Sequence, residues 1–90
     1  MAACFNLGTF TIAANASMSL VTAFGGFPQQ DAGVVMFMAT PKTNGILEVQ
    51  HQGKQRFGSA PGLIQYPFTV KNNTASALQF TLQAGIVCQP

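Results

Sequence analysis

Charged side chains are scarce in this chain, and none stands near either end. Four Lys or Arg and two Asp or Glu make up 7% of the 90 residues, whereas a soluble domain commonly uses about 25%. All of them lie between Asp31 and Lys71, so residues 1–30 and 72–90 are uncharged. Charge keeps a folded surface hydrated and prevents self-association. Its absence over both ends predicts that these segments lie against other protein.

The shortage of ionisable groups also argues against several classes of function. The four basic residues, of which only Lys54 and Arg56 are close in sequence, are too few for aligned phosphate contacts, so we expect no nucleic-acid binding. Acid–base catalysis needs paired groups, and the chain has one Asp, one Glu and one His. Two Cys and one His match no recognised zinc spacing. We therefore expect no catalytic residues, no metal and no cofactor.

Neither a membrane span nor a leader peptide is predicted near the start of the chain. Residues 5–24 are uncharged, but Asn, Ser and Thr interrupt them, and a spanning helix needs about 20 predominantly apolar residues. No basic segment precedes an apolar stretch, as it would in a secretory signal. The chain is therefore expected to be made in the cytoplasm, unless a leader has been removed.

The hydrophobic residues that are present recur with a period of two, which is typical of half-buried strands. Alternating or apolar runs occupy residues 9–12, 17–22, 33–39, 46–51, 64–70 and 78–83. Turn residues separate them at 14–16, 25–28, 40–45, 58–62 and 71–75. The pattern predicts a single all-β domain over residues 1–90, a sandwich, jelly roll or small barrel of about six to seven short antiparallel strands. Pro67 has no N–H to donate, so its strand is expected to be an edge or to carry a bulge.

The run at 33–39 is apolar on both faces. Such a strand is either covered on both sides or meets a neighbouring subunit with its outer face. We assign Met36 and Met38 to core filling. The candidate contact residues in this run are Val35 and Phe37. Polar residues of the two uncharged strands at 9–12 and 78–83 complete the set: Thr9, Thr11, Thr81 and Gln83.

One polar segment, residues 51–56, is a candidate contact site. His51, Lys54 and Arg56 offer donors for an anion or a carbohydrate. The alternative, which we favour, is a solvated hairpin turn in which Gly53 adopts a positive φ. Residues 52–61 as a whole are expected to form an exposed loop.

Cys4 and Cys88 stand near opposite ends of the chain. If the first and last strands pair, a disulfide could join them and contribute about 4 kcal/mol for so long a loop. Two reduced thiols are the equally weighted alternative, natural for a cytoplasmic product. Asn15 and Asn72 begin sequences of the glycosylation type, which we interpret as turn chemistry because Asn tolerates the left-handed region.

Few charges, Thr- and Gln-rich strands and no catalytic set make the chain similar in composition to small bacteriophage virion proteins, of the minor capsid, cement, decoration or spike-base type. The resemblance implies a non-enzymatic assembly subunit in the virion, a homo-oligomer such as a trimer or larger ring, bound to a capsid shell. The alternatives are an extracellular β-sandwich binding module or a pilus-type subunit, using strand-edge or carbohydrate contacts.

Overall fold

The computed structural model describes residues 3–23, 31, 33–57 and 63–88, and within them the chain is all-β, with seven strands and no helix. The strands are β1 (Ala3–Ile12), β2 (Ser17–Thr22), β3 (Val34–Pro41), β4 (Leu47–His51), β5 (Gln55–Phe57), β6 (Leu63–Asn72) and β7 (Leu78–Cys88). No helix in these residues is long and apolar enough to cross a membrane. The turns predicted at 25–28 and 58–62 lie outside the described residues.

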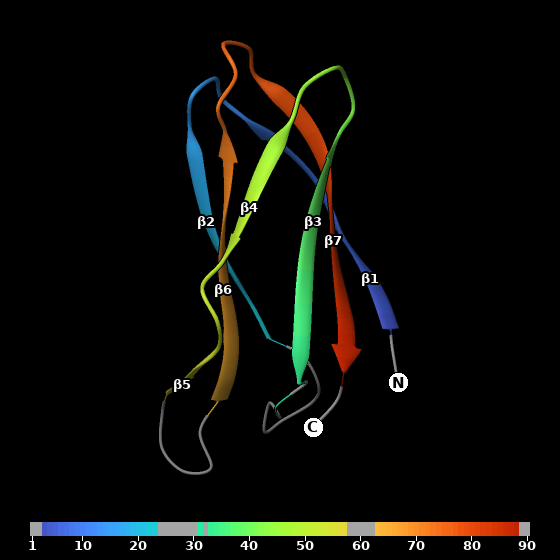
Figure 1. Cartoon of the computed structure of the whole chain (residues 1–90), viewed down its shortest axis with the longest axis vertical. Coiled ribbons are helices and arrows are strands. Elements are labelled where there is room, and N and C mark those ends of the chain that lie inside the picture. Colours follow the sequence, from blue (N-terminus) through green and yellow to red (C-terminus); the bar gives the residue numbers. More distant parts are fainter. Residues whose placement is uncertain (1–2, 24–30, 32, 58–62, 89–90) are drawn as a thin grey trace.

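The strands form two antiparallel sheets (Figure 1). Sheet A has the order β1-β7-β3, and sheet B has the order β2-β6-β4, with β5 also paired to β6. The turns after β1, β3 and β6 each carry the chain from one sheet to the other, and all three lie at the upper end in Figure 1. Each sheet keeps two edge strands within the described residues, so neither closes into a barrel.

The inner faces of the two central strands form most of the hydrophobic core. The buried hydrophobic side chains of β6 are Ile64, Tyr66, Phe68 and Val70, and those of β7 are Leu78, Phe80, Leu82, Ala84 and Ile86. Phe37 of sheet A stacks on Phe68 of sheet B with ring centroids 3.9 Å apart. The period of two therefore correctly predicts which residues of β6 and β7 face inward.

A buried polar side chain organises the upper end of the fold. Asn72 is completely buried, and its Nδ2 donates to the carbonyl oxygens of Ile12, Ala13 and Ser76 at 3.4, 3.1 and 2.9 Å. Its Oδ1 accepts from the backbone N–H and the hydroxyl of Thr74 at 3.0 and 2.6 Å. This side chain therefore joins the turn after β1 to the turn after β6, and the interpretation of Asn72 as turn chemistry agrees with its contacts.

The strand that contains Pro67 is not an edge, because β6 lies between β2 and β4. The irregularity is instead in its neighbour. The carbonyl oxygen of Pro67 accepts a hydrogen bond from the N–H of Gln52 at 3.1 Å, so the backbone nitrogen of Pro67 also faces the β4 side. A continuous partner strand on that side would need an N–H donor from residue 67, which proline does not have. Residues 52–54 leave the ladder at this point, and the chain pairs with β6 again as β5.

The faces of β3 are the reverse of those expected, and within the described residues this strand is an edge of sheet A. Phe37 is 2% exposed and Val35 packs against the core, so neither can lie in an outer contact surface of this fold. Met36 and Met38, expected in the core, are 48% and 59% exposed. Both alternating sets on this strand are apolar, so periodicity alone cannot choose between the faces.

Candidate functional site

The broadest candidate surface is the outer face of sheet A. Its residues follow from the register of β1 and β3 on β7 and from the groove described below: Cys4, Asn6, Thr9, Thr11, Met36, Met38, Thr40, Gln79, Thr81, Gln83, Gly85 and Val87. None of these residues is charged. Of the expected contact residues, Thr9, Thr11 and Gln83 are exposed on this face, and Thr81 is half-buried there. Parts of both uncharged ends, β1 and β7, therefore lie side by side in sheet A, whereas β2, which also belongs to the uncharged segment 1–30, lies in sheet B.

The lower half of this face is apolar. Met36, Met38 and Val87 are between 48% and 59% exposed, although they are large hydrophobic side chains. Sequence reasoning missed all three. The two-sided hydrophobicity of the run at 33–39 was the only signal for Met36 and Met38, and Val87 had none. An exposed apolar patch on a small domain is typical of a contact surface.

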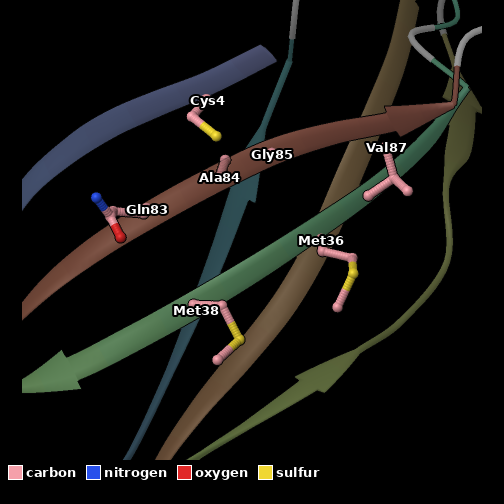
Figure 2. Close-up of a pocket in the computed structure, with 7 residues that line it drawn as sticks. All are labelled: Cys4, Met36, Met38, Gln83, Ala84, Gly85 and Val87. Carbon is pink, nitrogen blue, oxygen red and sulfur yellow. The ribbon is translucent and has the colours of Figure 1, made fainter. Parts of the chain in front are cut away.

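A shallow groove crosses this apolar half (Figure 2). Gly85 lies between Cys4 of β1 and Met36 of β3 in the register, so the central strand presents no side chain there. The groove has a volume of about 240 Å³, and Met38, Gln83 and Val87 also line it. Flexible Met side chains on one wall allow such a groove to adapt to the shape of an occupant.

The outer face of sheet B has a different character. It carries Ser17, Ser19, Val21, Glu48, Gln50, Gln65, Pro67, Thr69 and Lys71, as the register of β2 and β4 on β6 gives. Glu48 lies directly opposite Lys71 on neighbouring strands. Glu48 also accepts hydrogen bonds from Gln50 at 2.9 Å and from Asn73 at 3.3 Å. This face therefore differs from that of sheet A in carrying Glu48 and Lys71, although it also exposes Val21 and buries Thr69.

The three residues of the candidate polar loop have separate environments. His51 Nε2 accepts a hydrogen bond from the backbone N–H of Phe37 at 2.9 Å, which joins the neighbouring edges of the two sheets. Lys54 pairs with Asp31, and Arg56 lies in β5. Gly53 has the expected positive φ of 81°, but its segment is a break between β4 and β5 along β6 rather than a hairpin turn. The geometry therefore shows no convergent set of donors formed by His51, Lys54 and Arg56.

Asp31 is the centre of a small polar cluster that the sequence did not indicate. Its Oδ1 accepts from Lys54 Nζ at 2.6 Å, from the N–H of Gly33 at 2.8 Å and from the hydroxyl of Tyr66 at 3.2 Å. The hydrogen bond from Lys54, followed by the one from Gly33, lowers the pKa of the Asp31 carboxyl. The hydrogen bond to Asp31 in turn raises the pKa of Lys54. The cluster ties the segment before β3 to the break after β4, which is a structural role.

The remaining reactive groups are dispersed. Cys4 is a free, exposed thiol, and its partner in the register is Gly85. The backbone of Cys88 is paired with Val34 on the other side of β7, and its side chain lies outside the described part of the structure. Among the described residues, no three His, Cys, Asp or Glu side chains are grouped so that they could hold a metal ion.

Comparison with protein-family models, with curated proteins and with solved structures finds no match to this chain.

Proposed function

We propose that the chain is a non-enzymatic structural subunit that acts through protein–protein contacts. The observation that carries this proposal is the outer face of sheet A, which is free of charge and exposes Met36, Met38 and Val87. Apolar surface in water is unfavourable by about 25 cal/mol per Å². Contact with another protein removes that cost, and the groove over Gly85 offers a place for an apolar side chain.

The type of subunit we propose is a small β-sandwich protein of a bacteriophage virion, in a minor capsid, cement, decoration or spike-base position. Two sheets that share one core support the sandwich form. Outward-facing Thr and Gln with few charges support a surface that is covered in an assembly. In this proposal the partners are further copies, in a closed ring such as a trimer, and a larger capsid shell.

A second candidate function is a binding module or pilus-type subunit that uses a strand edge. The observation that favours it is β1, ten residues long and the edge of sheet A within the described structure. It carries neither Pro nor a charged residue. Pro and charged residues are two of the features that protect an exposed edge from pairing with other chains. An extended segment of a partner could add to such an edge.

Sedimentation velocity of the purified chain over a wide micromolar range tests the proposal. We expect species larger than the 9.5 kDa monomer that grow with concentration. A single monomeric species throughout, together with no co-purification with proteins encoded beside its gene, contradicts a structural role. Capsid, portal or terminase genes in that neighbourhood support the virion assignment, whereas secretion or pilus-assembly genes support the second candidate.

A further inference from the structure

We infer that the outer face of sheet A binds a second copy of this chain, face to face about a two-fold axis. The inference rests on the proposed function and adds the surface through which two copies meet. It replaces the closed ring of that proposal by a two-fold pair. Its basis is the juxtaposition of Cys4, Met36, Met38, Gln83 and Val87 around the groove over Gly85. The Thr row formed by Thr9, Thr81 and Thr40 continues the same face toward the upper end.

The absence of charge on the outer face of sheet A favours a second copy of the chain as its partner. In a two-fold contact the same patch of both copies meets itself, so any charge near the axis faces an identical charge. The outer face of sheet A carries none, whereas the outer face of sheet B carries Glu48 and Lys71. The face of sheet A can therefore meet its own copy in any two-fold arrangement without apposed like charges. A partner with a charged surface would lose hydration here without gaining a compensating charge.

The size of the face is sufficient for this contact. Three strands about 4.8 Å apart, each with about ten residues at about 3.3 Å per residue, present roughly 500 Å². Two copies then bury on the order of 1,000 Å², the lower bound for a specific interface. The apolar half supplies hydrophobic contact area, and the Thr side chains toward the upper end supply polar contacts.

Two matched glutamines allow the proposal to be tested. Gln83 is exposed on the outer face of sheet A, and Gln50 is exposed on the outer face of sheet B. Gln83→Lys places a charge on the contact face of each copy, and we expect it to raise the dimer dissociation constant on the order of 100-fold. Gln50→Lys adds the same charge beside Glu48 and should leave that constant within about threefold of the wild type. Both constants come from sedimentation velocity over a concentration series.

The outcomes separate this inference from the proposed function. Loss of dimer in Gln83→Lys with retention in Gln50→Lys supports the inference. Equal assembly of wild type and both variants overturns it but leaves the structural role intact, with the contact elsewhere, for example at the β1 edge. A wild type that is monomeric yet binds another virion protein also overturns it, whereas a monomer without any partner overturns the proposed function as well.

Thiol labelling keeps the test decisive if Gln83→Lys fails to fold. Cys4 is an exposed thiol in the proposed contact. In a Cys88→Ser background, a maleimide should label Cys4 at least about tenfold more slowly at concentrations where the dimer forms than after dilution, because a buried thiol is less accessible. A labelling rate independent of concentration, in a sample that sedimentation shows to be dimeric, overturns the inference.

Discussion

The imidazole Nε2 of His51 accepts a hydrogen bond from the backbone N–H of Phe37 at 2.9 Å. His51 ends β4, an edge of sheet B, and Phe37 lies in β3, an edge of sheet A. The two rings are also in contact, with centroids 5.7 Å apart. A single side chain thus satisfies an edge donor of the opposite sheet and links the two sheets beside the core. The bond requires a neutral ring with its proton on Nδ1, because a protonated imidazole has no acceptor.

Replacing His51 tests this link. His51→Leu should lower the free energy of unfolding by about 1 kcal/mol at pH 7.5, because the N–H of Phe37 loses its acceptor. His51→Gln, whose amide oxygen can accept, should retain more of the stability. Urea unfolding measures both. Equal stabilities of His51→Gln and His51→Leu would contradict the assigned bond.

Asn72 should be among the most sensitive polar positions of the fold. Asn72→Ala removes donors to three carbonyl oxygens and the acceptor of Thr74, and we expect a loss of about 3 kcal/mol in the free energy of unfolding. The neighbouring Asn73→Ala is the control, because Asn73 is exposed and donates only one long bond, 3.3 Å, to Glu48. Its expected cost is within about 0.5 kcal/mol. Equal costs at both positions would show that the buried hydrogen bonds do not stabilise the two turns.

These positions show which parts of the structure can be predicted from the sequence. Residues 78–83 alternate strictly between apolar and polar, so the strand and its inner face follow from the pattern alone. The bonds of Asn72 to residues 12 and 13 join segments about sixty positions apart, and no local signal indicates them. The turn chemistry of Asn72 was predictable, but its structural importance was not.

Strand β5, which lies in a segment expected to be an exposed loop, and the reversed faces of β3 have a common cause. Gln55–Phe57 has only three residues and follows a break, and its strand geometry depends on pairing with β6. The faces of β3 depend on which residues pack on Phe68 of the other sheet. Both features are set by contacts between distant segments rather than by the period of the sequence. The candidate face was therefore predictable as uncharged, but its apolar residues were not.

Two adjacent residues of β3 provide a test of these faces. Phe37→Ala should destabilise the fold by about 3–5 kcal/mol, because it leaves a cavity against Phe68. Met38→Ala should change the free energy of unfolding by less than about 0.5 kcal/mol, since Met38 is 59% exposed. Urea titration of the monomer at low concentration measures both. The opposite ranking would restore the faces expected from the sequence.

The Asp31–Lys54 pair should make stability depend on pH at both extremes. The pKa of Asp31 is lowered in the folded chain by its hydrogen bonds from Lys54 and Gly33. Its contribution is therefore present above the carboxyl's unfolded pKa and is lost as pH falls below about 4. The pKa of Lys54 is raised, so its contribution is lost as pH rises above about 10.5. Both side chains are partly exposed, at 36% and 41%, and solvent screening keeps the effect small.

Asp31→Asn isolates this effect. The stability difference between wild type and Asp31→Asn should be largest near pH 7 and should narrow below about pH 4, where the wild-type carboxyl is protonated. Chemical unfolding midpoints from about pH 7 to about pH 2.5 measure it. A difference that grows as the solution is acidified has the wrong sign for a carboxyl with a lowered pKa.

Salt distinguishes an apolar contact from an ionic one. Exposed charges are screened as salt rises from about 0.05 to 0.5 M, whereas burial of apolar surface is not weakened. The outer face of sheet A has no charged residue, so oligomers formed there should persist across this range and tighten in sulfate. Sedimentation in sodium chloride and in ammonium sulfate provides the comparison. Dissociation in sodium chloride that reverses on dilution of the salt would assign the contact to charged residues such as Lys54 and Arg56, and assembly would then occur through the break between β4 and β5.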